Sequence, residues 1–318
     1  MFYLGIDSGG TKAAFLLGDE TGRIYARYTG KGCTVLADGK AGVQRMVEEG
    51  VAAVCTQAGI TKDDIVCLGL GISGYGEGEH AKREPFEACA AVLSEDRVIC
   101  QCDTYVGWAG SLLCTPGINV IAGTGSVVYG VNAKGEEVRA GGWGCWDAGC
   151  DEGSCTWHGQ QLVQEWTKQA DGRRPRTGLY TLFRDHFGVT NDEFFIHALN
   201  VDVATGHNLP ELQRLLKAIW DTGDPAAAEI YDRGAEELWQ GVRVVAEKLG
   251  LSGTNYPVSY SGGLFKAGAC ALEPLRKRIE AGGAHLADPL FPPEVGALLM
   301  AIRHKNPHMD LHNFTIYE

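Results

Sequence analysis

The sequence lacks a long apolar run, an excess of basic residues and any pair of cysteines spaced Cys-x-x-Cys. No apolar stretch reaches the roughly 18 residues that a membrane helix needs. Lysine and arginine total 28 against 40 aspartates and glutamates, and the net charge is −12. No basic face is therefore expected to offset the repulsion of nucleic-acid phosphates. The N-terminus shows no signal sequence. These absences argue against membrane and nucleic-acid partners and predict a cytoplasmic protein.

Cysteine, in contrast, is abundant, with eleven residues in 318. Several of them, such as Cys55 and Cys89, fall in predicted helices, where a reduced thiol packs as a small hydrophobic group. A disulfide framework is not expected in a large cytosolic chain. Three other cysteines, Cys145, Cys150 and Cys155, cluster in one loop region and raise the alternative of a bound metal cluster.

The first twelve residues place a carboxylate and two glycines between two short apolar strands, residues 2–6 and 13–17. The connection is too short for a crossover helix, so it predicts a β-hairpin. Backbone N–H groups at such glycines suit phosphate oxygens, and a carboxylate can hold a hydrated magnesium ion. A plain turn is the alternative interpretation. The predicted ATP contacts are Gly9, Gly10, Thr11 and Lys12, and the predicted magnesium residue, acting through water, is Asp7.

Two further glycine turns follow apolar strands later in the chain. The first connects residues 118–123 with residues 127–131, and the second lies between a strand that begins at Val258 and a helix. Their predicted ATP contacts are Gly123, Thr124, Gly125, Ser126, Gly262 and Gly263.

Hydrophobic periodicity predicts strands alternating with helices in both halves of the chain. In the first half, the predicted order is three strands followed by helix, strand, helix, strand and helix. The second half is predicted to repeat this order loosely. Residues 153–249 are mostly helical, and Asp224 followed by Pro225 predicts the start of a long helix. A turn near Thr115 marks the domain boundary without a flexible linker, which suits a hinged cleft.

These three glycine turns, in this order, resemble those of the sugar kinase/Hsp70/actin superfamily. The resemblance implies an α/β, actin-like ATPase (ribonuclease H-like) fold: two duplicated βββαβαβα domains around a nucleotide cleft. It implies a first domain of residues 1–117, joined by a C-terminal helix near 294–306. A second domain of residues 118–293 would carry a helical insertion. ATP and Mg²⁺ are the implied cofactors.

Asp103 follows the predicted strand 98–102 and precedes a helix near residues 105–113. Binding sites of α/β proteins usually lie at this carboxyl end of a sheet. In the resembling kinases this position holds the catalytic base, which deprotonates a sugar hydroxyl during transfer of the γ-phosphoryl group. A helix N-cap is the alternative and is compatible with that role.

A second motif joins Gly142-Trp143-Gly144 to Asp151-Glu-Gly-Ser154 and a helix. It resembles the N-acetylglucosamine kinase group within the BadF/BadG/BcrA/BcrD-type ATPases, and the resemblance spans nearly the whole chain. It implies that Gly142, Trp143, Gly144 and Asp151 bind the sugar together with Asp103. Glu152 and Ser154 could instead only begin the helix.

The sequence departs from this family pattern on the acceptor side alone. The segment between Gly144 and Asp151 is about two residues longer, and Cys150 replaces a glycine. Thr34 stands where the family uses a sugar-binding asparagine, and it is the predicted substrate residue of that loop. The predicted ATP-binding residues match the family pattern and indicate phosphoryl transfer. The predicted sugar-binding residues depart from it, so they do not identify a particular sugar.

Three functions follow from the sequence. The first is an ATP-dependent kinase acting on a hydroxyl of N-acetylglucosamine, glucosamine or N-acetylmuramate, expected as a homodimer. The second is an activator ATPase of a dehydratase or reductase, with an iron–sulfur cluster held by cysteines. The third is a non-catalytic sugar sensor. Because the kinase motifs are all present and the cysteine spacing is irregular, the kinase is the main hypothesis.

Overall fold

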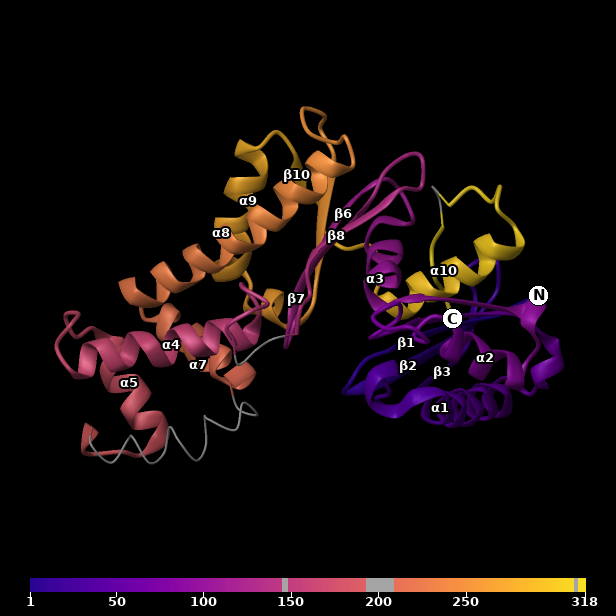
Figure 1. Ribbon diagram of the computed structural model, residues 1–318, viewed down its shortest axis with the longest axis horizontal. Helices are drawn as coiled ribbons and strands as arrows, with labels where there is room; N and C mark the ends of the chain where they lie inside the picture. The colour runs from indigo at the N-terminus through magenta and orange to yellow at the C-terminus, as the bar shows by residue number, and fades with distance from the viewer. Residues whose placement is uncertain (145–147, 193–208, 312–313) are drawn as a thin grey trace. The chain divides into compact units, whose positions relative to one another are not determined.

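The computed structural model describes residues 1–144, 148–192, 209–311 and 314–318, which form two compact units (Figure 1). The first unit contains Met1–Thr115 and Asp288–Glu318, and the second contains Pro116–Ala287. The sequence placed these limits at residues 117 and 293. Residues from Asp288 onward belong to the first unit because the N–H groups of Leu290 and Phe291 donate to the carbonyls of Ser111 and Gly110.

The first unit is built on a five-stranded sheet of order β3-β2-β1-β4-β5. Its first three strands form the predicted antiparallel hairpins, and β4 and β5 extend the sheet in parallel with β1. The carboxyl ends of β1, β4 and β5 therefore meet at one edge. The strands are β1 (Phe2–Ser8), β2 (Lys12–Gly18), β3 (Ile24–Lys31), β4 (Ile65–Ile72) and β5 (Val98–Cys102).

Helices cover both faces of this sheet (Figure 1). The helices α1 (Val35–Ala58) and α2 (Arg83–Val92) pack on one face. The other face carries α3 (Asp103–Leu112) and α10 (Pro293–Lys305). The helix α1 begins at Val35, where Thr34 caps a first turn that ends at Gly39. Gly39 has a φ of 56°, outside helical geometry, and this break hides the early start from sequence periodicity.

The helix α10 lies directly on the backbone of β1 and β4. A Cβ at Gly5 would come within 2.4 Å of the carbonyl oxygen of Glu294, and one at Gly69 within 2.4 Å of the carbonyl oxygen of Ala297. Any larger side chain at either glycine would push the helix away from the sheet. These two glycines fix α10 against the strands that carry Asp7 and Ser73 at their ends.

The second unit repeats the sheet, with order β10-β9-β6-β7-β8. Its first three strands form two antiparallel hairpins, and β9 and β10 add in parallel with β6. Its strands are β6 (Gly117–Ala122), β7 (Ser126–Val131), β8 (Glu137–Gly141), β9 (Pro257–Ser261) and β10 (His285–Leu286).

A set of helices separates β8 from β9, at the position of the predicted insertion. The longest, α8 (Pro225–Lys248), begins as predicted: the Asp224 carboxylate accepts from the N–H groups of Ala226 and Ala227. The others in this segment are α4 (Cys155–Ala170), α5 (Gly178–Phe187) and α7 (Leu209–Asp221). A further helix, α9 (Ala269–Ala281), connects β9 with β10. No helix in the described part of the chain is long and apolar enough to cross a membrane.

Candidate functional site

The first unit gathers carboxylates at the carboxyl edge of its sheet. Asp7 is the penultimate residue of β1, Asp103 follows β5, and Glu294 lies in the first turn of α10. Burial is the main cause that raises the pKa of Asp7 to about 7, and the negative charges of Asp103 and Glu294 act in the same direction. The ammonium group of Lys12 opposes them. Two poorly solvated carboxylates, Asp7 and Asp103, thus lie near the charge of Glu294, which is an arrangement typical of functional sites.

Asp103 occupies the first turn of α3 and is held by defined donors. Its Oδ1 accepts the N–H of Thr104 at 2.9 Å, and the hydroxyl of Ser73 hydrogen-bonds the same carboxylate. Burial raises the pKa of Asp103, the Thr104 N–H lowers it, and the nearby carboxylate of Glu77 raises it. Asp103 is the first residue of the helix and not its N-cap, which is Cys102. The Asp103 side chain is therefore held by hydrogen bonds, although Asp103 is not the N-cap of α3.

The predicted phosphate hairpin forms as expected between β1 and β2. The N–H of Gly9 donates to the carbonyl of Lys12 at 3.1 Å, which closes the turn, and Gly10, Thr11 and Lys12 are exposed. A Cβ at Gly9 would meet no protein atom within 4 Å, so packing does not require glycine there. Their roles toward ATP stay predictions.

Thr34 lies beside this hairpin. A Cβ at Gly10 would be 3.9 Å from the methyl carbon of Thr34. The Thr34 hydroxyl accepts the N–H of Ala37 at 3.2 Å, and its own N–H donates to Asp38 at 2.9 Å. The predicted substrate residue therefore also serves as the N-cap of α1. The cap uses one lone pair of its hydroxyl, which keeps a proton to donate.

In the second unit, two of the predicted glycine turns lie next to each other. The strands β6 and β9 are parallel, with Ile121 aligned to Ser261, so their carboxyl ends are adjacent. A Cβ at Gly123 would be 3.9 Å from the backbone nitrogen of Gly263. Gly262 has a φ of 106°, and a Cβ there would be 2.3 Å from the carbonyl oxygen of Ala122. Glycine is thus required at Gly262 by the fold itself.

The turn at residues 123–126 is fastened to the start of α4. The N–H of Cys155 donates to the carbonyl of Gly123, and the hydroxyl of Thr156 donates to the carbonyl of Thr124. In the other direction, Ser126 donates its hydroxyl to the carbonyl of Glu152 at 2.7 Å. These three bonds connect the predicted ATP turn to the Asp-Glu-Gly-Ser motif and the start of α4.

Asp151 organises the predicted sugar loop. Its Oδ1 accepts the N–H groups of Trp143 at 2.9 Å and Gly144 at 3.1 Å, and the residue is only 5% exposed. Its φ of 59° is uncommon for a residue other than glycine, although Asp tolerates it. Trp143 is 74% exposed. The predicted residues Gly142, Trp143, Gly144 and Asp151 thus form one connected loop, in which the carboxylate holds the backbone.

The clustered cysteines do not combine into a metal site in the described residues. Cys145 lies outside them, Cys150 is partly buried, and Cys155 is buried at the start of α4. Burial raises the pKa of the Cys155 thiol to about 11, which disfavours the thiolate that metals bind. Among the described residues, no group of three His, Cys, Asp or Glu side chains is arranged to hold a metal ion.

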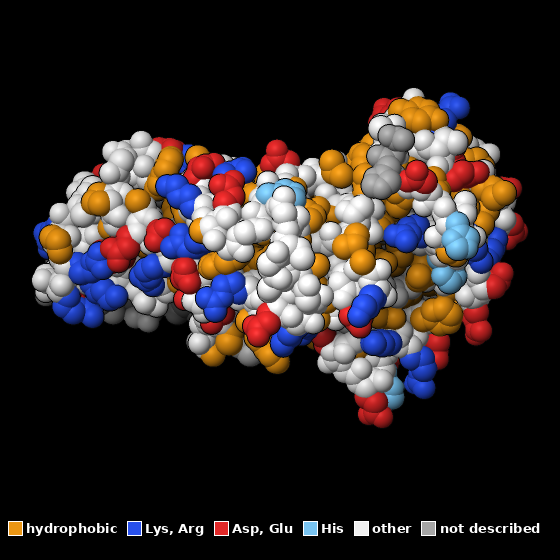
Figure 2. All heavy atoms as spheres, turned by 90° about the horizontal axis from the view of Figure 1, so that it is seen from above, with side chains coloured by type: hydrophobic (Ala, Val, Ile, Leu, Met, Phe, Trp, Pro, Cys, Tyr) orange, Lys and Arg blue, Asp and Glu red, His pale blue; other side chains and the backbone are white. Residues whose placement is uncertain are grey.

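The basic cluster at residues 173–176 is occupied by ion pairs. Arg173 pairs with Asp171, and Arg174 pairs with both Glu165 and Glu229. Basic and acidic side chains also lie among one another on the face shown in Figure 2. The Arg174 pairs connect this segment to α4 and α8, and all of these pairs offset its positive charge.

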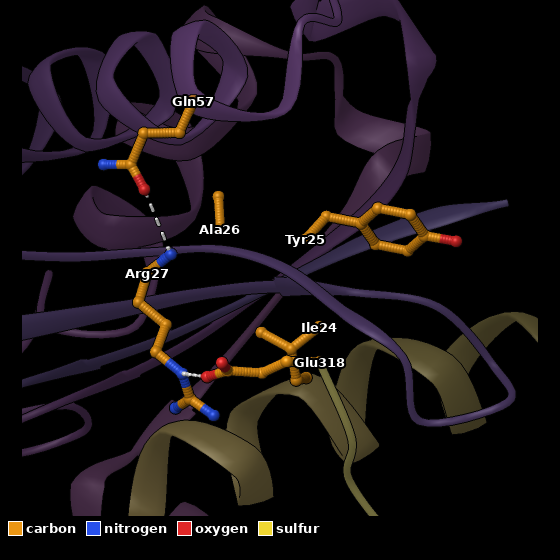
Figure 3. A pocket seen from close by; sticks show the side chains of 6 residues that line it. All are labelled: Ile24, Tyr25, Ala26, Arg27, Gln57 and Glu318. Atoms are coloured by element: carbon orange, nitrogen blue, oxygen red, sulfur yellow. Dashed lines mark hydrogen bonds and ion pairs between the residues drawn. The ribbon is translucent and has the colours of Figure 1, made fainter.

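One cavity, of about 320 Å³, lies away from these residues at the outer edge of β3 (Figure 3). Gln57 accepts the N–H of Arg27 there, and the Arg27 guanidinium lies 3.6 Å from Glu318. The cavity contains none of the predicted site residues. A smaller cavity of about 170 Å³ borders the Thr34 loop and includes Gly30, Gly32 and Cys33.

Three acidic or polar residues near Asp103 and Asp7 were absent from the sequence prediction: Ser73, Glu77 and Glu294. They lie on a loop and a helix far from Asp103 in sequence, and no motif marks them. Ser73 follows the buried strand β4, and this position at a parallel strand end was the one signal available.

The BadF/BadG/BcrA/BcrD ATPase family model matches residues 4–301. The chain is 24% identical over 263 residues to an N-acetylmuramic acid/N-acetylglucosamine kinase of Clostridium acetobutylicum, covering 83% of this chain and 85% of that one. It is 27% identical over 319 residues to the N-acetyl-D-glucosamine kinase of Dictyostelium discoideum, covering 95% and 98%.

A solved structure from Chromobacterium violaceum, assigned as an N-acetylglucosamine kinase, superposes with a TM-score of 0.74. It is 27% identical, with 94% of this chain and 98% of that chain covered. The expected actin-like ATPase fold and the family resemblance are confirmed. The match covers nearly the whole chain, and the chain belongs to the BadF/BadG/BcrA/BcrD ATPase family.

Proposed function

We propose that the protein is an ATP-dependent kinase that phosphorylates a hydroxyl of an amino sugar of the N-acetylglucosamine, glucosamine or N-acetylmuramate class. The observation that carries this proposal is the environment of Asp103: a carboxylate at a strand end, oriented by two donors, with its pKa raised by burial. A raised pKa makes a carboxylate a better proton acceptor near neutral pH. The kinase names of the full-length relatives support the same reaction.

In the proposed reaction, Asp103 accepts the proton of the acceptor hydroxyl while that oxygen attacks the γ-phosphorus of ATP. A new O–P bond forms, and the bond between the γ-phosphorus and the bridging oxygen of ADP breaks. The glycine turns at Gly9–Gly10, Gly123–Gly125 and Gly262–Gly263 are the proposed phosphate and nucleotide contacts. Asp151 holds the loop that is proposed to contact the sugar.

Magnesium is the proposed cofactor, and Asp7 is the residue that would hold it, through water. The fit rests on the charge around Asp7: Asp103 and Glu294 raise its pKa together with burial. A divalent cation would neutralise this excess of negative charge. When bound, such an ion neutralises charge on the transferring phosphoryl group.

The acceptor is the least determined part of the proposal. A site that hydrogen-bonds particular hydroxyl or amide groups discriminates strongly, because unmatched polar groups are left unpaired. Thr34 stands where the family pattern has asparagine, so a hydroxyl and a methyl group replace an amide there. We therefore propose an amino-sugar acceptor whose preferred member need not be N-acetylglucosamine itself.

The test is ADP release by the purified protein, with Mg²⁺ and ATP, across a panel of hexoses, glucosamine, N-acetylglucosamine and N-acetylmuramate. The proposal expects turnover on at least one amino sugar that exceeds turnover on glucose. Inactivity across the panel would overturn it, and iron in anaerobically purified protein would then favour the activator ATPase. Light scattering of the same sample tests the expected homodimer.

A further inference from the structure

Ser73 lies at the centre of the carboxyl edge of the first sheet. It follows β4, which is the strand between β1 and β5. Its N–H donates to the carbonyl of Ser8 at 3.0 Å, and its carbonyl accepts the N–H of Val35 at 3.1 Å. The backbone of Ser73 is thus fixed on one side to the phosphate hairpin and on the other to the loop that contains Thr34.

The chain makes a sharp turn directly after this residue. Gly74 has a φ of 85°, and a Cβ there would be 3.1 Å from the Cγ of Leu36. This left-handed conformation favours glycine, and it turns the chain away from the sheet edge. The position of Ser73 is therefore set by both backbone bonds and by the turn that follows it.

The strands β4 and β5 are parallel, with Ile72 aligned to Cys102, so Ser73 and Asp103 follow adjacent strand ends. There the Ser73 hydroxyl hydrogen-bonds the Asp103 carboxylate. The same carboxylate accepts the Thr104 N–H. Two donors from different elements, the loop after β4 and the start of α3, restrict the rotation of the Asp103 side chain. The negative charges that face Asp103 are those of Glu77 and Asp7, and Asp7 is itself faced by Glu294 and Lys12.

We propose that Ser73 is a positioning residue, which orients Asp103 toward the acceptor hydroxyl and ties that orientation to the hairpin and the Thr34 loop. This inference rests on the proposed kinase function. A displacement of the acceptor loop or of the hairpin moves the Ser73 backbone, and with it the donor that orients the base. Ser73 itself touches neither the proton nor the phosphorus in the reaction.

The test compares Ser73→Ala with Ser73→Thr in the full-length protein. Ser73→Ala is expected to lower kcat by about 10–100-fold, because small misplacements of a catalytic group have effects of this size. The KM for ATP should change little. Losing a donor to the carboxylate also raises the pKa of Asp103, so the acidic limb of the pH–rate profile should move to higher pH. Ser73→Thr keeps a hydroxyl and should restore most of the rate and the profile.

Ser111→Ala is the matched control. It removes the same hydroxyl group from a buried serine of the first unit, whose donor bond goes to the carbonyl of Trp108. This variant should keep the wild-type pH profile. A Ser73→Ala enzyme with wild-type kcat and profile would overturn the proposal. A slow enzyme with an unmoved acidic limb and no rescue by threonine would overturn it as well, since both results describe a structural role alone.

A second readout separates this inference from the kinase proposal. If no sugar on the panel is phosphorylated, the proposed function fails, but the carboxyl ¹³C signal of Asp103 can still be titrated by NMR. A higher titration midpoint in Ser73→Ala than in wild type and Ser111→Ala supports the positioning contact. Equal midpoints in all three proteins overturn it.

Discussion

The two sheets share one strand order but differ in what stands at their strand ends. In the first unit, the ends of β1, β4 and β5 carry Asp7, Ser73 and Asp103. In the second unit, the ends of β6 and β9 lead into the glycine turns at Gly123 and Gly262. The carboxyl edge of the first sheet thus carries negative charge and a side-chain donor. The carboxyl edge of the second sheet carries mainly glycine turns, whose polar groups belong to the backbone.

The comparison shows how one duplicated framework supports two kinds of chemistry. Carboxylates at a buried strand end suit proton transfer and cation binding, because burial shifts their pKa values. Glycine turns suit anions, because their N–H groups are accessible. Each edge is also supported differently: Ser73 joins three segments in the first unit, whereas Ser126, Cys155 and Thr156 fasten the glycine turn in the second.

The largest expected effect comes from the first edge. Asp103→Asn should lower kcat by about 10²–10⁴-fold, because it removes a positioned proton acceptor. The KM for ATP should stay within a few-fold of wild type, since the proposed nucleotide contacts lie on other residues. Steady-state kinetics on the best sugar of the panel measure both values.

The control for that experiment is Asp63→Asn, which makes the same chemical change at a side chain that is 82% exposed. It should leave kcat unchanged. Near-normal turnover by Asp103→Asn would mean that the carboxylate only supports the start of α3, and the proposed mechanism would be wrong.

An intermediate effect is expected at the sugar loop of the second unit. Asp151→Ala leaves the Trp143 and Gly144 N–H groups without their acceptor. Because both residues are exposed and water can replace the acceptor, the stability loss should be about 0.5–1.5 kcal/mol. The KM for the sugar should rise by about 10-fold or more as the loop loosens. Asp151→Asn keeps an acceptor oxygen and tolerates the φ of 59°, so it should remain close to wild type. Equal damage by both substitutions would show that the carboxylate charge itself binds the sugar.

A smaller effect concerns stability at the acidic edge. The folded pKa of Asp7 is about 7, above its ordinary 3.8. Between about pH 4 and pH 7 the folded protein holds a proton that the unfolded chain has released, so this residue makes the folded state less stable as pH rises. Asp7→Asn is neutral throughout and should be more stable than wild type by about 1–3 kcal/mol at pH 8 without magnesium. Urea unfolding at pH 5 and pH 8 measures this, and an unchanged difference between the two pH values would refute it.

The smallest expected effect comes from alanine substitution of two glycines, Gly9 in the predicted phosphate hairpin and Gly262 at a position that the fold restricts to glycine. Gly9→Ala introduces a Cβ that meets no protein atom within 4 Å, so stability should change by less than about 1 kcal/mol. The KM for ATP should nevertheless rise several-fold if the hairpin binds phosphate. Gly262→Ala, at a φ of 106°, should instead lose about 1–3 kcal/mol of stability. Thermal unfolding and ATP kinetics on both variants would contradict the assignment if Gly9→Ala were the less stable protein.

Much of this framework could be predicted from the sequence, because strands and glycine turns are local features. The hairpin at Gly9, the strand before Asp103 and the start of α8 at Asp224 all follow from nearby residues. The long helical segment between β8 and β9 was equally visible in its periodicity.

The remaining features depend on contacts between distant segments. Ser73 and Glu294 reach the neighbourhood of Asp103 and Asp7 only after the sheet is assembled and α10 has packed on it. The capping of α1 by Thr34 was hidden because Gly39 interrupts the periodicity. The bonds from Asp151 to Trp143 and Gly144 could not be separated in sequence from a direct role in sugar binding.

The packing of α10 on Gly5 and Gly69 has a consequence for synthesis on the ribosome. The second unit is continuous, so all of it leaves the ribosome before residues 293–305 do. The strands of the first sheet therefore leave the ribosome early. The sheet face at Gly5 and Gly69 stays uncovered until α10 has been synthesised. Because domains tend to fold as units during translation, the continuous second unit can complete its core first. Glu294 arrives on α10, so the acidic group around Asp7 is complete only in a nearly finished chain. A truncated or stalled nascent chain would thus lack the full charge around its proposed metal-binding residue.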